Sequence, residues 1–283
     1  MVHKRISIYG NLGEEIPIAN FQLFLELSHS YMALLVKDAL NNQLLAIELF
    51  EFDSMLNNWD QIFHHIQLDS KILDQAYGDN RIFYNFPEAL LIPSNNFSMD
   101  SIEGYLNAIY GDNNKTVLKH EKIGDEPSFI NAYRIKKEII DIIENKFTIG
   151  NSIHSYTSII ENVFLGTAAN KHIGFLKVQF YQHLMVVVLL KDGALQLIQS
   201  YTFQNADTIA YHLSNIIQQF DLLPQDVEIN ISGLIDFNGE ELACIRQLFT
   251  AISFDNIPTQ HALLNDNDHY PLHFFSPFIK LLV

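Results

Sequence analysis

The sequence predicts an α/β fold built from two similar halves, because one pattern of apolar runs occurs twice along the chain. In the second half, three β-rich runs lie at residues 175–180, 184–190 and 195–203, and an amphipathic helix and another apolar run follow them. Asp192 and Gly193 separate the second run from the third, and Asp-Gly between apolar runs is a strong hairpin signal. This order predicts three antiparallel strands, a helix and a further strand.

The helix of the second half is defined by the spacing of its apolar residues. Asn205 and Asp207 precede or begin it, and both residue types are favoured as N-caps. Residues three and four apart share a helix face, so the apolar set predicts one buried side. That set is Ile209, Leu213, Ile216, Ile217 and Phe220.

The first half repeats the same unit about 150 residues earlier. Its apolar runs lie at 23–27, 32–36 and 44–50, and Asn41-Asn42 supplies the hairpin turn. A helix follows, with Asp53 or Ser54 as its expected cap and with an apolar side. That side is Leu56, Trp59, Phe63 and Ile66. The repeat predicts a duplication, with domains at 1–168 and 169–283; two unrelated strand-and-helix segments are the alternative.

Between and after the repeats, the sequence predicts further elements. Residues 81–93 read as a strand, a kink at Pro87 and a second strand. The polar stretch 112–127 is expected to be an exposed, mobile segment. Helices are expected at 98–109, 136–147, 158–167 and 240–252, and strands at 128–135, 152–157 and 253–257.

Composition narrows the class of protein. The 283 residues are 48% hydrophobic, which is enough for large cores. A net charge of −16 argues against binding nucleic acid or an anionic membrane surface. No apolar run is long enough for membrane insertion, and the basic N-terminus lacks the apolar core of a signal peptide. A single cysteine, Cys244, fits a reducing compartment, so we expect a cytoplasmic protein.

The segment between the repeats carries a resemblance to known families. Residues 127–147 and 151–164 resemble the segment between the lobes of PilM-type pilus-assembly proteins and of type II secretion L-type cytoplasmic domains. Over most of its length the chain also resembles the uncharacterised domain-of-unknown-function family 3822, through residues 129–135, 197–223, 229–233 and 273–275. The resemblance implies an actin-like ATPase (ribonuclease H-like) fold, duplicated, with a mixed five-stranded sheet flanked by helices in each lobe.

The resemblance also says where a nucleotide would bind. ATP-binding actin-like proteins place an Asp-x-Gly turn after the first strand of each lobe, where the carboxylate holds metal-bound water and glycine admits the phosphates. The matching positions here are Glu26 and Ser28 in the first half and Gln179 and Tyr181 in the second. On the adenosine side, Gly233 is the one glycine that remains.

These cofactor-binding positions lack the Asp-x-Gly pattern. We therefore expect a nucleotide cleft that is degenerate and binds no cofactor. The expected function is a non-enzymatic scaffold or protein-interaction module with no catalytic residues. The alternatives are a divergent ATPase or kinase-like enzyme that binds ATP with Mg, and a small-molecule sensor.

An interface is expected in the aromatic C-terminus, because several large apolar side chains follow the last strand that the fold needs. These residues are Tyr270, Phe274, Phe275 and Phe278. The partner is expected to be another protein, of unknown identity, and a homodimer is also open to this chain. The alternative is that the segment packs on its own lobe.

No metal site is expected. His64 and His65 are adjacent on a helix and point about 100° apart. Asp266, Asp268, His269 and His273 form a denser group, but Pro271 interrupts any helix that would bring the two histidines together. Cys244 lies among apolar residues and reads as a buried, inert thiol.

Overall fold

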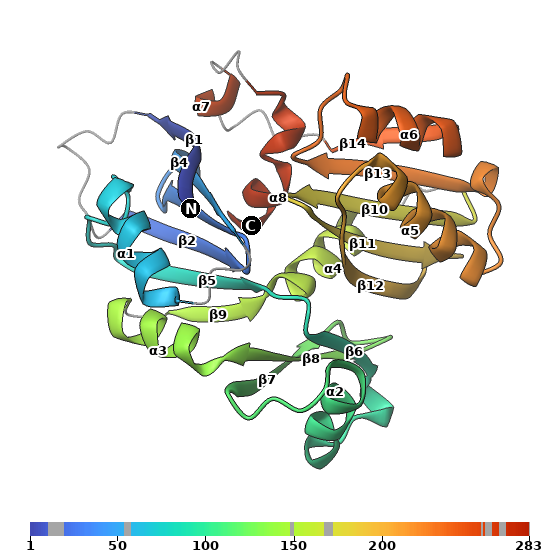
Figure 1. Ribbon diagram of the computed structural model, residues 1–283, viewed down its shortest axis with the longest axis horizontal. Coiled ribbons are helices and arrows are strands. Elements are labelled where there is room, and N and C mark those ends of the chain that lie inside the picture. Colours follow the sequence, from blue (N-terminus) through green and yellow to red (C-terminus); the bar gives the residue numbers. More distant parts are fainter. Residues whose placement is uncertain are drawn as a thin grey trace. The chain divides into compact units, whose positions relative to one another are not determined.

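The computed structural model describes residues 1–10, 20–53, 58–147, 150–166, 172–255, 257, 262–265 and 270–282 (Figure 1). The chain forms two compact units. Unit 1 comprises residues 1–161, 259–266 and 282, and unit 2 comprises residues 162–258, 267–281 and 283. The expected domain boundary after residue 168 lies outside the described residues.

The main sheet of unit 1 has the strand order β1-β4-β3-β2-β5-β9. Strands β2, β3 and β4 pair antiparallel, β5 and β9 extend the sheet in parallel with β2, and β1 pairs antiparallel with β4. These strands are β1 (Val2–Tyr9), β2 (Phe21–Ser28), β3 (Tyr31–Asp38), β4 (Gln43–Phe52), β5 (Asp79–Asn85) and β9 (Asn151–His154). The three expected strands of the first repeat are confirmed, and β1 makes this sheet six-stranded rather than five-stranded.

The first helix begins later than expected. Helix α1 (Trp59–Asp69) buries Trp59, Phe63 and Ile66, as the spacing of the apolar residues predicts. Its N-cap is Asn58, whose side-chain oxygen accepts a hydrogen bond from the backbone N–H of Gln61 at 3.0 Å. The prediction of Asp53 as the cap is therefore wrong, and Ser54 and Leu56 lie outside the described residues.

A smaller sheet follows β5 in unit 1, with the order β6-β8-β7. It consists of β6 (Ala89–Pro93), β7 (Thr116–Ile123) and β8 (Phe129–Lys136), joined through short 3-10 turns, η2 (Ser94–Asn96) and η3 (Met99–Ser101), and helix α2 (Ile102–Tyr110). Strands on both sides of Pro87 are confirmed. Most residues of the segment 112–127 are exposed, as expected, but half of the segment forms the ordered strand β7, which the sequence did not predict.

Strand β7 forms although its composition is polar, because it is held by pairing and by one carboxylate. It pairs with β8 along its whole length. Glu121 of β7 accepts hydrogen bonds from the Tyr133 hydroxyl and, at 2.5 Å, from the Thr157 hydroxyl. Tertiary contacts thus override the low β propensity of Lys and Glu.

Two helices complete unit 1 and lead to unit 2. Helix α3 (Lys137–Lys146) buries Ile139, Ile140, Ile142 and Ile143, and α4 (Ser155–Gly166) begins directly after β9. The division between the two units falls within α4, after Glu161.

Unit 2 is built on a five-stranded sheet with the order β12-β11-β10-β13-β14. Its strands are β10 (Gly174–Tyr181), β11 (Leu184–Lys191), β12 (Ala194–Thr202), β13 (Val227–Gly233) and β14 (Ala251–Phe254). Helices α5 (Ala206–Gln219) and α6 (Glu240–Leu248) pack their apolar sides on one face of this sheet, and η4 (Pro224–Asp226) precedes β13. Asn205 caps α5 as expected.

The C-terminal part of the chain adds short helical turns. These are α7 (Ala262–Asn265), η5 (Leu272–Phe274), α8 (Ser276–Ile279) and η6 (Lys280–Leu282). Contacts of η5 and α8 with β13 place these two turns on the unit 2 sheet.

The register shows that the two units repeat each other residue by residue. Glu26 lies opposite Ala33 in the first hairpin, and Gln179 lies opposite Val186 in the second. In both hairpins a two-residue turn separates the strands. The first strand of each hairpin, β2 or β10, also pairs in parallel with the strand that follows the helix, β5 or β13. The duplicated fold expected from the sequence is confirmed.

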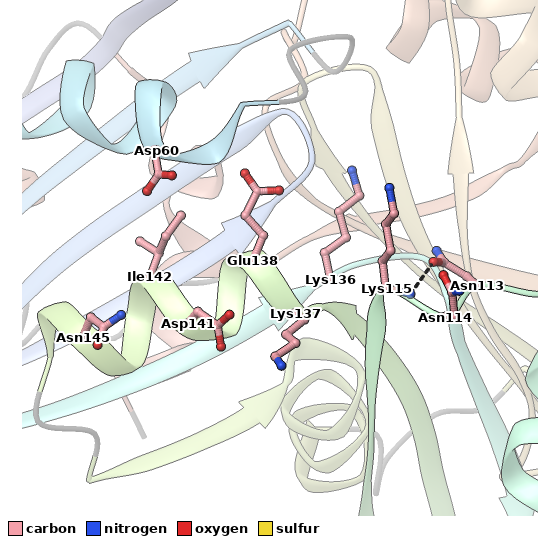
Figure 2. A pocket seen from close by; sticks show the side chains of 10 residues that line it. All are labelled: Asp60, Asn113, Asn114, Lys115, Lys136, Lys137, Glu138, Asp141, Ile142 and Asn145. Atoms are coloured by element: carbon pink, nitrogen blue, oxygen red, sulfur yellow. Dashed lines mark hydrogen bonds between the residues drawn. The ribbon is translucent and has the colours of Figure 1, made fainter.

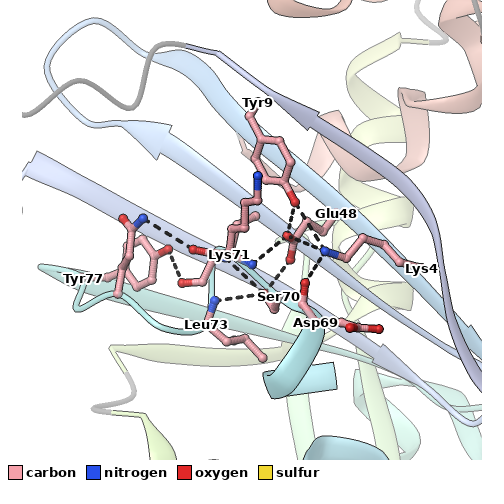
Figure 3. A network of polar contacts seen from close by, with 10 residues as sticks. Lys4, Tyr9, Glu48, Asp69, Ser70, Lys71, Leu73 and Tyr77 are labelled. Atoms are coloured by element: carbon pink, nitrogen blue, oxygen red, sulfur yellow. Dashed lines mark hydrogen bonds and ion pairs between the residues drawn. The ribbon is translucent and has the colours of Figure 1, made fainter. Parts of the chain in front are cut away.

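One buried carboxylate fixes the edge strand β1 to unit 1 (Figure 3). Glu48 of β4 accepts hydrogen bonds from the Tyr9 hydroxyl, from the Lys4 ammonium at 3.3 Å, from the Ser70 hydroxyl at 2.5 Å and from the Lys71 N–H at 3.0 Å. Because Ser70 follows α1, this carboxylate joins three elements. A buried carboxylate is tolerated when several hydrogen bonds replace its contacts with water in this way.

Candidate functional site

The nucleotide-contacting position expected in unit 1 lies where three parallel strands end. Glu26 and Ser28 close β2, Asn85 closes β5, and Ser155 follows β9. Ligands of open α/β sheets bind at the carboxyl ends of the parallel strands, so these residues occupy a candidate binding position. Each of these side chains has an exposed fraction of 0%.

Hydrogen bonds connect these residues into an enclosed group. The Glu26 carboxyl accepts one bond from the Ser155 hydroxyl at 2.6 Å and another from the Tyr31 hydroxyl at 3.0 Å. The Asn85 amide in turn donates to the Tyr31 oxygen at 2.6 Å. Glu26 thus joins the first hairpin to the start of α4, and its two oxygens face protein groups.

Burial dominates the electrostatics of Glu26. Burial raises the pKa of Glu26 to about 7, although the hydrogen bonds from Ser155 and Tyr31 act in the opposite direction. A carboxyl that holds metal-bound water must open toward the ligand, whereas both oxygens of Glu26 accept hydrogen bonds from hydroxyl groups of the protein.

In unit 2 the corresponding position is filled by an aromatic ring. Tyr181 is 2% exposed, and its hydroxyl donates to the side-chain oxygen of Gln179 at 3.1 Å. The ring of Phe278 packs edge-on against Tyr181, with centroids 5.9 Å apart. Tyr181 is therefore packed inside unit 2, with its hydroxyl bonded to a neighbouring side chain.

Gly233 has a structural role that the sequence did not reveal. It ends β13 with a φ of 87°, and a Cβ atom there would lie 2.0 Å from the carbonyl oxygen of Phe180. The next residue, Leu234, donates its N–H to that same oxygen at 2.8 Å. Close approach of two backbones therefore accounts for the glycine.

The aromatic C-terminus packs within unit 2. Phe275 and Phe278 are fully buried, Phe274 is nearly so, and the half-buried ring of Tyr270 lies within 6.2 Å of Phe274 and Phe275. This burial corrects the expectation that these rings face a partner. In the structure the segment packs on its own unit, which is the alternative stated above.

A buried ion cluster fastens this C-terminal segment, and no sequence pattern pointed to it. Asp255, just after β14, accepts from the Lys177 ammonium at 2.5 Å, from the Ser276 hydroxyl at 2.6 Å and from the Lys280 ammonium at 2.7 Å. Lys177 also donates to the Asn230 side chain at 2.6 Å. The one sequence feature that could have indicated it is a lysine within the largely apolar run at 175–180.

The pKa values of this cluster reflect its depth. Burial lowers the pKa of Lys177 to about 7, and Asp255 opposes that change. Burial acts to raise the pKa of Asp255, but the two lysines more than offset it and hold that pKa at about 2. The cluster connects β10, β14 and the C-terminal turns, and Lys177 at its centre is 2% exposed.

An open groove lies elsewhere in unit 1 (Figure 2). Its volume is about 840 Å³, and mostly polar side chains from α1, the end of β8, α3 and the loop before β7 line it. The ammonium groups of Lys115 and Lys136 point the same way on one side, and the carboxylates of Asp60 and Glu138 lie on the other. The full lining is Asp60, Asn113, Asn114, Lys115, Lys136, Lys137, Glu138, Asp141, Ile142 and Asn145.

The groove was not found from the sequence, because its residues come from three separate segments. Their local composition is that of ordinary solvated surface. One contact within it is structural: the Glu138 carboxylate accepts from the backbone N–H of Trp59 at 3.1 Å, at the start of α1. The ammonium groups of Lys115 and Lys136 lie across from the carboxylates of Asp60 and Glu138, so the groove carries both positive and negative charge.

Metal-ligating side chains do not converge within the described part of the chain, where no group of three or more is found. Asp266, Asp268 and His269 lie outside the described residues. His273 is buried, and its Nε2 lies 2.8 Å from the carbonyl oxygen of Ile235. Cys244 is half-buried on α6. Along the described residues, helices of the length and apolarity needed to cross a bilayer are absent.

Comparison with known proteins supports the fold and the family. A protein of unknown function with an actin-like ATPase fold from Bacteroides thetaiotaomicron is 13% identical, with a TM-score of 0.73 over 88% of this chain and 97% of that one. The PilM-PilN type IV pilus biogenesis complex includes a chain that is 10% identical, with a TM-score of 0.61 over 92% of this chain and 96% of that one.

Among curated proteins, none matches the sequence. A family model, "Protein of unknown function (DUF3822)", matches residues 15–252. The chain, with its duplicated α/β sheets and an actin-like ATPase fold, therefore belongs to the DUF3822 family.

Proposed function

We propose that this protein is a non-enzymatic, actin-like scaffold whose partner is another protein. The observation that carries the proposal is the enclosure of the Glu26 carboxyl by the Ser155 and Tyr31 hydroxyls. A metal-bound water or a phosphate would need the space and the lone pairs that these groups use. The burial of Tyr181 against Phe278 supports the same conclusion in unit 2.

A protein partner is supported by the fold neighbour and by the groove. The similar PilM structure is that of a complex with PilN. In this chain the open groove of unit 1 has a volume in the range of ligand sites and carries both signs of charge. We assign partner binding to this groove, where a polypeptide segment with acidic and basic side chains meets Lys115 and Lys136 on one wall and Asp60 on the other.

The proposal includes a cytoplasmic location. It rests on the single cysteine, which fits a reducing compartment, and on an acidic composition that does not favour anionic membranes.

Affinity purification from the native host, at the natural expression level, tests the assignment of the groove. The variant Lys115→Glu/Lys136→Glu reverses two exposed charges on its cationic wall. We expect the wild type to retain a partner in stoichiometric amount and this variant to lose it, since like charges across an interface are repulsive.

The matched control is Lys71→Glu/Lys122→Glu, which makes the same charge change at exposed positions outside the groove lining. The control must retain the partner. Recovery of the same proteins with all three forms would remove the groove from the account.

A further inference from the structure

The groove of unit 1 contains one carboxylate whose position is fixed. The Glu138 side chain extends from α3 into the groove (Figure 2), and its Oε1 accepts a hydrogen bond from the backbone N–H of Trp59 at 3.1 Å. The other two carboxylates in the lining, Asp60 and Asp141, form no hydrogen bond or ion pair with the described residues. Glu138 is therefore the acidic group of the groove that has a set orientation.

Both ends of this hydrogen bond are held by the core of unit 1. Trp59 is the first residue of α1 and is 3% exposed, and its ring packs edge-on against Phe52, with centroids 5.7 Å apart. Glu138 precedes Ile139 and Ile140, which are buried on α3. The N–H groups in the first turn of a helix lack partners within the helix, and the helix dipole favours a carboxylate there. The core thus places the Glu138 carboxylate at the start of α1.

The second oxygen of Glu138, Oε2, remains available to a ligand. Glu138 is exposed, and within the described residues its one hydrogen bond is that to Trp59, and no lysine or arginine forms an ion pair with it. An exposed side chain normally loses rotamer freedom when it forms an ion pair, which is one reason why most surface pairs contribute little. Because Glu138 is already restrained, a contact with Oε2 costs less entropy. A charge-assisted hydrogen bond at this atom is accordingly favourable.

We propose that Glu138 selects the polypeptide that occupies the groove, because its Oε2 accepts a hydrogen bond from a basic side chain of that polypeptide. Lysine and arginine share the required chemistry, a cation that carries N–H donors. The acidic side chains of the same polypeptide then face Lys115 and Lys136. This inference rests on the proposed function and adds to it the residue that recognises the positive charge of the partner.

Trp59 supplies the measurement, because it is the only tryptophan of the chain. In protein labelled with a nitrogen isotope at tryptophan, the NMR spectrum contains one backbone amide signal, that of the N–H group bonded to Glu138. N-acetyllysinamide and N-acetylargininamide are the probes for the two basic side chains. We expect the amide signal to shift with increasing probe and to reach a plateau with at least one of them. N-acetylglycinamide, which is uncharged, and sodium chloride at equal concentration should produce no such shift.

The variant Glu138→Gln separates the charge from the hydrogen bond. Glutamine retains an oxygen that accepts from the Trp59 N–H, so the amide signal should still report on the groove, but its shift with the probes should be lost. Glu103→Gln is the matched control, since it makes the same change at an exposed position in the first turn of α2, outside the groove lining. This control should respond as the wild type does.

Two results would overturn the proposal: a wild type whose Trp59 signal responds to neither probe, and an undiminished response in Glu138→Gln. Affinity purification with Lys115→Glu/Lys136→Glu tests the groove without changing Glu138. A partner lost by that variant, together with no probe response at Trp59, would uphold the proposed function and reject the role of Glu138. A Glu138-dependent response with unchanged recovery of the partner would support Glu138 as a cation-binding residue and reject the groove as the site of the partner.

Discussion

At Glu26, burial and hydrogen bonding act on one carboxyl in opposite directions. The carboxyl is fully enclosed, and burial raises its pKa from 4.5 to about 7. A carboxyl whose pKa is higher in the folded state than in the unfolded state favours folding at low pH, because the folded state binds its proton more tightly. This contribution is fully present below pH 4.5 and is lost as the pH rises through about 7.

The Glu26→Gln variant tests this linkage. Glutamine keeps the shape and cannot ionise, so the stability of the variant relative to the wild type should rise between pH 4.5 and pH 8. A shift of this size corresponds to roughly 3 kcal/mol at most. Urea unfolding of both proteins across that pH range measures the difference. A difference that does not change with pH would show that Glu26 titrates normally.

Gly233 allows a second test at a single residue. A Cβ atom there would meet the Phe180 carbonyl at 2.0 Å, at a φ of 87°. We therefore expect Gly233→Ala to cost roughly 3 kcal/mol or more in unfolding free energy.

Gly193→Ala is the matched control for this prediction. Gly193 has a similar positive φ of 75° with open space around it, so the same substitution should cost about 1 kcal/mol, from the backbone alone. Equal losses in the two variants, measured by urea unfolding, would contradict the role assigned to close backbone approach.

Among the elements, those with a strong local pattern were predicted from the sequence. The three antiparallel strands of each repeat, helix α5 with its Asn205 cap and the strands around Pro87 each have periodicity or turn residues that specify them. Strand β7 was missed, because its polar sequence becomes a strand only through pairing with β8 and through the contacts of Glu121.

The site was less predictable than the fold. The positions of Glu26 and Tyr181 followed from the register of the repeat, but their enclosure depends on Ser155 and Phe278, which are about 130 and 100 residues away along the chain. The Asp255 cluster and the groove also join distant segments. Such contacts leave no local pattern, so only the tertiary structure reveals them.

The C-terminal segment gives a prediction at the scale of an element. Phe275 has an exposed fraction of 0%, and contacts of η5 and α8 with β13 hold the segment on its unit. Phe275→Ala should therefore lower the unfolding free energy by roughly 3–5 kcal/mol, the usual cost of removing a buried aromatic ring. Denaturant unfolding measures this loss. A variant of wild-type stability that no longer binds a partner would restore the segment as an interface.

For the whole molecule, the structure combines an actin-like ATPase fold with buried side chains at the positions that the resemblance predicts to contact nucleotide. Unit 1 has an enclosed carboxyl, and unit 2 has a tyrosine packed under the C-terminal segment. The fold alone does not specify an activity, because a site requires particular groups in an accessible place. The proposed scaffold role follows from these local differences.

Thermal melting of the full chain with and without millimolar ATP and magnesium tests this account most directly. A ligand that binds the folded state at 100 times its dissociation constant adds about 2.7 kcal/mol, which would raise the melting temperature of a chain of this size by about 5 °C. We predict no shift beyond that caused by magnesium and an equal concentration of pyrophosphate. A reproducible rise of several degrees with ATP, absent with pyrophosphate, would contradict the account and indicate a divergent nucleotide-binding enzyme.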